Sequence, residues 1–583
     1  MKTISVLAAT VLLAGVVFGG SGERKKDQPQ KNIMDEGSIV PASGQRIAPV
    51  LDAAGITWVL IDSMANCYGM LSNRVKPLAY DPPSGMLAMI HRGHTAYAVG
   101  SGQLWYNTSS DGGTTWTRVS ELNAGNPTNS RYPSATISNP GGGAPMLFSH
   151  ASPQLNPAAF GFTIYGVDIL GSGSPFAVEA QGTNTYWSNT SIWAASDNPW
   201  VLWTTRRSTE VDYYLWRTND YVTISEGVPP QWAASNFQAL GLDIGGSYRD
   251  GTHYFALWGD FSAPDPITPD ANVGYSRSTD NGATWSAWIR PQPNWRITNV
   301  GPYHLWDFGG AGVFSIDMSV DANDRVHFFG AVVDTVTLQR GIVEIYETGS
   351  GWAGKVISND LKESTVLTYN GLNQMGNHLN AATSPDGQVM ALFWLDAAAQ
   401  GDTLPDIWFA YRRIADNNWS TPVNLTQTGG PPPEILLQVA GDLRSNGGNS
   451  YTAFIARAYD CTGAFPPNDL TCTNVFVGAH TFTADPVSVG EHPELPSRFA
   501  LEQNYPNPFN PLTRIEYMLP VGSEVKLTVH NVLGQEVATL VNEFRNAGSH
   551  SAEFSAANLP SGVYYYTIRA GSFTTTSKMM LMK

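Results

Sequence analysis

The chain carries one octapeptide twice, as SSDGGTTW at Ser109–Trp116 and as STDNGATW at Ser278–Trp285. Each copy follows an aromatic segment, Leu104–Thr108 in the first case and Val273–Arg277 in the second. In such a turn the Asp carboxylate can accept backbone N–H bonds, the Gly can adopt a left-handed conformation, and the Trp can pack between sheets. We therefore predict a structural role, with no catalytic or metal-binding role for the two carboxylates. The residues that share the pattern are Ser109, Asp111, Gly113, Thr115, Trp116, Ser278, Asp280, Gly282, Thr284 and Trp285.

Two eroded copies follow, and they end at Trp352 and Trp419. From Trp285 onward the copies are spaced 67 residues apart, whereas Trp116 lies 169 residues before Trp285. The longer interval fits three units of about 56 residues each. Counting the first unit and one more after Trp419 gives seven units. Six is the alternative, because residues 120–235 carry no marker.

Between Gly44 and Phe482, short apolar runs alternate with turns rich in Gly, Asn, Asp, Pro and Ser, and helical periodicity is almost absent. A composition of 57 Gly, 38 Pro and only 14% charged residues suits an all-β fold with many tight turns. Several strands in each repeating unit predict a propeller or a β-solenoid. Runs that read as second strands of hairpins include Leu87–Ile90, Val201–Trp203, Tyr254–Trp258, Val326–Phe329 and Val389–Trp394.

The octapeptide resembles the Asp-box, or BNR repeat, of sialidases and many other β-propellers. This resemblance implies an all-β propeller of six or seven blades over residues 44–482. It places the octapeptide turns at the blade periphery, away from the central site. It also raises the hypothesis of a sialidase or a related glycosidase.

The catalytic residues that the sialidase family implies are not found. The family's first arginine lies in an F/Y-R-I-P segment before the first Asp-box, but here Arg74–Pro77 has the wrong spacing. Arg131–Pro133 has the right spacing but follows the first box. Asp81 is the one acidic residue between Arg74 and that box, and Asp81–Gly85 reads as a turn. The signature is therefore missing, and we lean towards a propeller that is not an enzyme.

Other templates give weaker signals. The sequence has no GxSxG elbow, HExxH helix or P-loop. We expect no cofactor, with calcium at the Asp260–Asp270 loop as the alternative. Aromatic residues that could stack on sugar rings are each more typical of core between blades, and they are Tyr186, Trp187, Trp193, Trp216, Trp295 and Trp306. Most histidines are expected to be structural, with a channel-lining subset left open, and they include His91, His94, His150, His253, His304, His327 and His378.

Residues 499–583 form a separate block after a Pro-containing linker at 483–498. Strands expected at 525–529, 536–540, 563–568 and 573–580 predict a small Ig-like β-sandwich. The block resembles the C-terminal type A sorting domain of the type IX (Por) secretion system, and an ordinary adhesion module is the alternative. The motif residues of this resemblance are Asn504, Tyr505, Pro506, Pro508, Phe509, Asn510, Pro511, Gly534, Gly562, Tyr564 and Lys583.

The N-terminus reads as a signal peptide at 1–22, followed by a linker at 23–43. We expect Sec export to the periplasm, type IX passage to the surface or medium, and no transmembrane span in the mature chain. The spacing of Cys461 and Cys472 is one that a disulfide can close, which would leave Cys67 unpaired.

A net charge of −16 argues against a nucleic-acid partner, because no basic surplus exists to replace phosphate counterions. The expected partners are the type IX machinery and a glycan or other extracellular polymer. The alternatives to a binding role are a glycoside hydrolase and a purely structural surface protein, since fold alone does not choose among them.

Overall fold

The computed structural model describes part of the chain. The predicted signal peptide and N-terminal linker, the three cysteines and the proposed disulfide, and residues 261–270 of the Asp-rich loop fall outside the described residues. The structure describes residues 50–583 except 52–54, 65–75, 94–102, 123–128, 157–158, 161–162, 175, 181–185, 188–190, 208–212, 228–241, 261–270, 290–302, 305–315, 335–339, 349–350, 360, 363–376, 400–404, 417, 428–435, 461–472, 487–498, 520–522, 546–547 and 572.

The described residues are all-β, as the sequence predicts. They form nine antiparallel sheets, seven of them before residue 484 and two after residue 499. One short 3-10 turn, Pro140–Gly142, is the only helical element in the described part. We number the first seven sheets in chain order and call them together the ring.

The first four sheets come from consecutive segments. Sheet 1 comprises β3 (Leu78–Tyr80), β4 (Leu87–Arg92), β5 (Leu104–Ser109) and β6 (Thr117–Glu121). Sheet 2 comprises β7 (Asn129–Ser138), β8 (Met146–Asn156), β9 (Ala159–Phe160), β10 (Thr163–Ile169) and β11 (Phe176–Ala180). Sheet 3 comprises β12 (Tyr186–Trp187), β13 (Ile192–Ala194), β14 (Val201–Arg207), β15 (Tyr213–Thr218) and β16 (Ser225–Gly227). Sheet 4 comprises β17 (Leu242–Arg249), β18 (Thr252–Asp260) and β19 (Ala271–Ser278).

The remaining three sheets complete the ring. Sheet 5 comprises β20 (Tyr303–His304), β21 (Ile316–Val320), β22 (Val326–Asp334), β23 (Arg340–Thr348) and β24 (Gly351–Ser358). Sheet 6 comprises β25 (Asn380–Thr383), β26 (Val389–Ala397), β27 (Pro405–Arg413) and β28 (Val423–Asn424). Sheet 7 comprises β1 (Val50–Leu51), β2 (Thr57–Met64), β29 (Leu436–Val439), β30 (Arg444–Gly447), β31 (Ser450–Asp460) and β32 (Thr473–Thr483).

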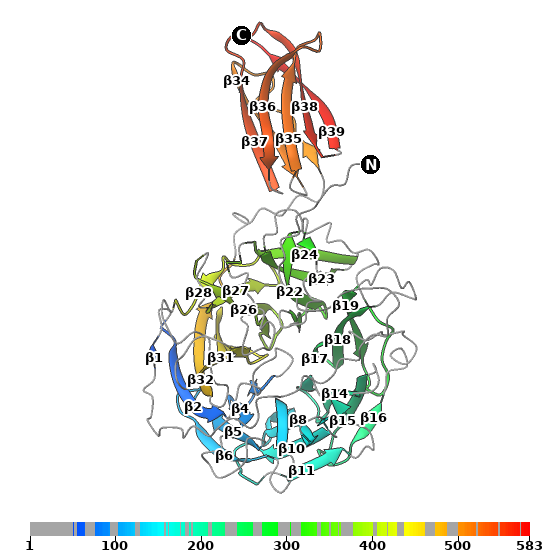
Figure 1. Cartoon of the computed structure of the whole chain (residues 1–583), viewed down its shortest axis with the longest axis vertical. Coiled ribbons are helices and arrows are strands. Elements are labelled where there is room, and N and C mark those ends of the chain that lie inside the picture. Colours follow the sequence, from blue (N-terminus) through cyan, green and yellow to red (C-terminus); the bar gives the residue numbers. More distant parts are fainter. Residues whose placement is uncertain are drawn as a thin grey trace.

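The two ends of this region meet in sheet 7. Strand β2 pairs with β32, so that Val59 lies opposite Val477 and Met64 lies opposite Thr473. The inner strands β3, β7, β13, β17, β21, β25 and β29 each contact the next, and β31 contacts β3. Figure 1 shows the sheets arranged around a central axis, with β2 beside β32. Radial sheets closed by the first and last strands are the architecture of a β-propeller.

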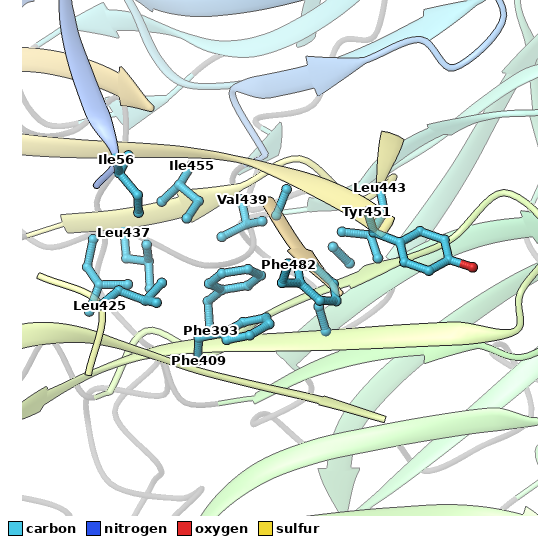
Figure 2. Packing of buried hydrophobic residues seen from close by; sticks show 14 of the residues in the cluster. Ile56, Phe393, Phe409, Leu425, Leu437, Val439, Leu443, Tyr451, Ile455 and Phe482 are labelled. Carbon is cyan, nitrogen blue, oxygen red and sulfur yellow. The ribbon is translucent and has the colours of Figure 1, made fainter. Parts of the chain in front are cut away.

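The core of the ring lies between neighbouring sheets. Figure 2 shows the cluster between sheets 6 and 7, where Phe393 and Phe409 face Val439 and Phe482. The rings of Phe393 and Phe409 lie 5.0 Å apart, and those of Phe409 and Phe482 lie 4.8 Å apart. Because each sheet buries both faces in this way, its strands read as continuous apolar runs, for example Val389–Ala397.

A buried charged network joins sheets 5 and 6. Arg412 Nη1 on β27 lies 2.6 Å from both carboxylate oxygens of Glu344 on β23. His327 Nδ1 lies 2.6 Å from Glu344 Oε1, and Trp419 Nε1 donates to Glu344 Oε2 at 2.8 Å. Burial acts to raise the pKa of Glu344, but Arg412, His327 and Trp419 outweigh it and hold that pKa at about 2. Glu344 is fully buried, so its charge depends on these partners.

The last 85 residues form two sheets over one core. One sheet comprises β33 (Ala500–Leu501), β34 (Leu512–Leu519) and β37 (Gly548–Ser555). The other comprises β36 (Glu536–Arg545), β35 (Ser523–His530), β38 (Gly562–Ala570) and β39 (Phe573–Leu581). Their inner faces share one apolar cluster, which includes Tyr517, Leu527, Phe554 and Tyr566.

The ring extends two residues into the predicted linker at 483–498. Thr483 pairs with Ser450, and the Ala484 N–H donates to Asn449 O at 2.7 Å while its side chain is buried. In the described part of the chain, no helix has the length and apolar character needed to cross a membrane.

Candidate functional site

The two octapeptide turns have the same hydrogen bonds. In the first, Asp111 Oδ1 accepts from Ser109 Oγ at 2.8 Å and from Thr115 N at 2.9 Å, and Asp111 Oδ2 accepts from Thr115 Oγ1 at 2.6 Å. In the second, Asp280 accepts the equivalent bonds at 2.8, 2.8 and 2.6 Å. The bonds that Thr115 donates lower the pKa of Asp111 to about 2. Both carboxylates are therefore engaged in holding their own turns.

The glycine and the tryptophan of each turn connect it to the sheets. Gly113 and Gly282 have φ values of 88° and 79°, and a Cβ on Gly282 would lie 2.7 Å from Leu202 Cδ2. Trp116 packs in the cluster between sheets 7 and 1, and Trp285 packs in the cluster between sheets 3 and 4. Trp352 and Trp419, which end the eroded copies, likewise pack between sheets 4 and 5 and between sheets 5 and 6.

We predict that Asp280→Ala destabilises the ring by about 1–2 kcal/mol, because the turn loses its acceptors for Ser278 and Thr284. Urea unfolding followed by Trp fluorescence measures this, since all 18 Trp residues precede residue 499. Asp280→Asn, which keeps one acceptor, should cost less. A variant that unfolds like the wild type but loses a binding activity would contradict the structural role.

The inner strands of adjacent sheets run in the same direction. Val439 N, at the end of β29, donates to Asn380 Oδ1 at 3.2 Å and joins sheets 6 and 7. Ala381 N donates to Asp317 Oδ2 at 2.8 Å, which joins sheets 5 and 6 near the starts of β21 and β25. We call this end of the ring the start face and the opposite end, where each inner strand turns into the next, the hairpin face. Buried or partly buried polar residues lie on the inner strands of six sheets or shortly before them, and they are Lys76, Ser134, Ser191, Asp317, Asn380 and Gln438.

An ion pair joins distant parts of the ring at the start face. Lys76 Nζ lies 2.6 Å from Asp317 Oδ2, although Lys76 precedes β3 of sheet 1 and Asp317 belongs to β21 of sheet 5. The Lys76 side chain is 23% exposed, whereas the Asp317 side chain is 4% exposed. Asp317 Oδ1 also accepts from Met318 N at 2.9 Å. The carboxylate is thus fixed by the backbone, and it positions the ammonium group of a partly exposed lysine side chain.

A second charged group lies at the hairpin face. The Asp442 residue is partly accessible to solvent. Burial of its carboxyl among the surrounding atoms raises the pKa to about 6; the positive charge of Arg249 opposes this shift, and the negative charge of Asp81 adds to it. Arg249 donates to Val320 O at 3.2 Å and to Pro385 O at 3.2 Å, so it spans the turns of sheets 5 and 6. The predicted turn at Asp81 is present, and Asp81 Oδ2 accepts from Asn139 Nδ2 at 2.7 Å.

Of the aromatic residues that the sequence singled out, the two whose side chains the structure describes lie in cores between sheets. Trp193 and Trp216 are buried in the cores beside sheet 3. Trp295, Trp306 and the side chains of Tyr186 and Trp187 fall outside the described residues. The described part of the chain holds no group of three or more His, Cys, Asp or Glu placed to bind a metal.

Several histidines take structural positions between or within sheets. His91 Nε2 lies 3.2 Å from Asp62 Oδ2 on β2, and His253 Nδ1 accepts from Trp193 Nε1 at 3.1 Å. Burial lowers the pKa of His150 to about 3 and that of His378 to about 4. His94 and the side chain of His304 fall outside the described residues.

In the C-terminal domain the opening motif holds the last strand. The buried Asn504 donates its amide to Pro506 O at 3.1 Å and to Thr513 Oγ1 at 2.9 Å. Phe509 is buried in the core, where its N–H donates to Met580 O at 2.9 Å and its carbonyl accepts from Met582 N at 3.0 Å. The predicted motif residues of this segment thus fix the end of β39.

The other motif residues shape turns and the chain end. Gly534 has a φ of 76° in the turn between β35 and β36. Tyr564 is buried and donates to Pro560 O at 2.9 Å. Lys583 Nζ donates to Ala557 O at 2.6 Å, and Lys583 N donates to Ser561 Oγ at 3.0 Å. Pro511 O accepts from Ala556 N at 2.9 Å.

The C-terminal domain matches a known family. Residues 503–582 match the family described as the secretion system C-terminal sorting domain. The chain is therefore exported through the type IX system to the cell surface or the extracellular space, and its sorting domain interacts with that machinery.

Solved structures resemble the chain only distantly. A protein of unknown function from Dyadobacter fermentans is 11% identical, with 73% of this chain and 99% of that chain covered and a TM-score of 0.37. The intramolecular trans-sialidase from Ruminococcus gnavus is 12% identical, with 73% and 100% covered and a TM-score of 0.32. The α-L-arabinofuranosidase from Fusarium graminearum is 11% identical, with 60% and 98% covered and a TM-score of 0.34. No curated protein matches the chain. Similarity at this level assigns no activity to the ring.

Proposed function

We propose that the ring is a seven-bladed β-propeller that the sorting domain delivers outside the cell, where it binds a glycan or a similar polymer. Each of the seven sheets is one blade in this proposal. The ligand lies over the axis at the start face. The observation that carries the proposal is the partly exposed Lys76 side chain, whose ammonium group pairs with Asp317 across the ring.

The ion pair suits the recognition of sugar hydroxyl groups. An ammonium group carries three donors, and among the described residues the Lys76 Nζ bond goes to Asp317 Oδ2. The remaining donors can bind hydroxyl oxygens of a sugar. Because the two charges cancel, the pair favours a neutral glycan over a polyanion, which would have to displace Asp317.

The same geometry supports binding rather than proton transfer at this face. Most glycoside hydrolases use two carboxyl groups, one of which exchanges a proton with the substrate or with water. Asp317 already accepts from Lys76, Met318 and Ala381, so its oxygens are occupied by fixed donors. Such a carboxylate orients its neighbour and does not serve as a general base.

We expect Lys76→Met to weaken binding of the ring's glycan by about tenfold, which corresponds to about 1.4 kcal/mol. A glycan array identifies the ligand, and calorimetry on the best-bound oligosaccharide measures the change. Lys355→Met on β24, the outer strand of sheet 5, is the matched control and should bind like the wild type. Equal affinity of the wild type and Lys76→Met would contradict this site.

One observation favours a second function, hydrolysis of glycosides at the hairpin face. A carboxyl whose pKa is raised towards neutrality can act as a general acid, and the pKa of Asp442 is about 6, raised mainly by burial and also by the negative charge of Asp81. A panel of fluorogenic glycosides tests this function. Turnover by the wild type that Asp442→Asn abolishes would support it, whereas the absence of turnover leaves the binding role as the function of the ring.

A further inference from the structure

The exposed apolar side chains of this protein are concentrated in its smallest domain. Eight of the eleven large hydrophobic residues that are exposed in the described structure lie after residue 499. Exposed apolar side chains do not stabilise an isolated domain in water, and they favour its association with a partner. Six of the eight lie in the sheet of β36, β35, β38 and β39 or directly adjoin it. One of them, Phe544, is near the end of β36, and the other five are Val532, Leu533, Tyr565, Met580 and Met582.

The strand register brings these five residues to the same end of that sheet. His530, the last residue of β35, pairs with Tyr565 of β38, so the turn containing Val532 and Leu533 continues past this end of the sheet. Tyr565 pairs with Lys578, and Val563 pairs with Met580, so Tyr565 and Met580 point to the same, outer face. Met582 follows the end of β39 directly. We call these five residues the apolar patch.

The turn that carries Val532 and Leu533 is held in place by its own polar residues. Asn531 Oδ1 accepts from Leu533 N and from Gln535 N, both at 3.0 Å. Asn531 Nδ2 donates to Gln535 Oε1 at 2.9 Å. Despite this order, Val532 is 68% exposed and Leu533 is 78% exposed. The turn therefore presents two apolar side chains to solvent from an ordered backbone, which lowers the entropy cost of binding a partner.

We infer that the apolar patch is the surface by which the sorting domain docks into an apolar groove of the export machinery. This inference rests on the sorting role of residues 503–582. Asn504, Phe509 and Tyr564 are buried, so a receptor cannot read them directly and they serve to hold the shape of the domain.

The charges near the apolar patch predict the charge at the rim of the partner's groove. Lys578 pairs with Tyr565 of the patch and Lys583 ends the chain, although the protein has a net charge of −16. The acidic residue beside the patch, Glu536, follows the turn of Leu533 and lies 3.7 Å from the ammonium group of Lys526. Arg569 and Lys578 lie on the outer face with Tyr565. A groove with an acidic rim is complementary to this surface.

Leu533→Asp in the full-length protein tests the inference. Burying a carboxylate in an apolar groove, with the loss of a central apolar contact, should cost at least about 2 kcal/mol, or roughly 30-fold in affinity. In a type IX host we expect the surface or medium pool to fall and the periplasmic pool to rise. Val423→Asp, at a 50% exposed site on the ring, is the matched control and should be exported normally.

Two further measurements separate the outcomes. Calorimetry on the purified variant checks that the C-terminal transition is unchanged, and Leu533→Ala, which adds no charge, should reduce export to a smaller extent. Normal export of both Leu533 variants would overturn the apolar patch. If removal of residues 499–583 still blocks export in that case, the sorting role stands and only the docking surface is wrong.

Discussion

Removal of residues 499–583 should leave the protein in the periplasm. The ring carries no part of the matched sorting domain, which covers residues 503–582, so the truncated chain presents nothing for the type IX machinery to bind. The two parts have separate cores, and the described clusters of the ring include no residue after Ala484. The ring should therefore still fold, and cell fractionation with surface immunolabelling measures where it accumulates.

Trp fluorescence is the control for this truncation. All 18 Trp residues lie before residue 499, so the truncated and full-length proteins should give the same urea midpoint by this signal. A folded, truncated protein that still reaches the cell surface in wild-type amounts would show that the address lies elsewhere in the chain. Loss of export together with an unfolded ring would require a shorter truncation, from residue 503.

Replacing Glu344 by Gln should destabilise the ring by about 3–5 kcal/mol, because it leaves a buried guanidinium group without its counter-charge. Arg412 is 5% exposed in its side chain and bonds to both oxygens of Glu344. Arg412 Cζ also lies 4.9 Å from the centroid of the Tyr346 aromatic group, but this cation–π contact cannot replace a full counter-charge. Urea unfolding followed by Trp fluorescence measures the loss.

Glu121→Gln is the matched control for this substitution. Burial raises the pKa of the Glu121 carboxyl, so removing its charge should leave the ring as stable as before or slightly more stable. Equal stability of Glu344→Gln and the wild type would contradict the role of the network that joins sheets 5 and 6.

The network also makes the stability of the ring depend on pH, with one limit at low pH, set by Glu344, and one at high pH, set by His327. The pKa of Glu344 is lowered from 4.5 to about 2, so its stabilising effect is present above pH 4.5 and is lost as the pH falls towards 2. Burial acts to lower the pKa of His327, but Asp321 and Glu344 outweigh it and raise that pKa above 6.5. The contribution of His327 is thus full below pH 6.5 and is lost as the pH rises through its raised pKa.

The local features of this protein could be predicted from its sequence. The octapeptide turns follow from short-range chemistry, since the Ser and Thr groups that donate hydrogen bonds to Asp111 and Asp280 lie within four residues of them. The expected strand at 525–529 appears as Ser523–His530, and that at 573–580 appears as Phe573–Leu581. The expected strand at 536–540 is half the observed Glu536–Arg545, because the later residues Asn542, Glu543 and Arg545 are polar and interrupt the apolar pattern on this edge strand.

The axis of the ring could not be predicted in the same way. Lys76 and Asp317 are 241 residues apart, and neither lies in a motif. Lys76 belongs to the segment Arg74–Pro77, which we considered only for its arginine. Asp442 and Arg249 likewise come from different sheets, and only ring closure by β2 and β32 brings such residues together. The sequence can predict such a long-range pair only when the number of sheets that separates its two residues is already known.

The most direct test of the sorting domain is to move it to another protein. A periplasmic reporter with its own signal peptide is fused to residues 483–583 and produced in a type IX host, beside the same fusion with Leu533→Asp. The reporter should appear at the cell surface or in the medium, and the Leu533→Asp fusion should remain largely in the periplasm. Retention of the unmodified fusion in the periplasm, with its C-terminal domain folded, would contradict the assignment of residues 503–582 as an export address.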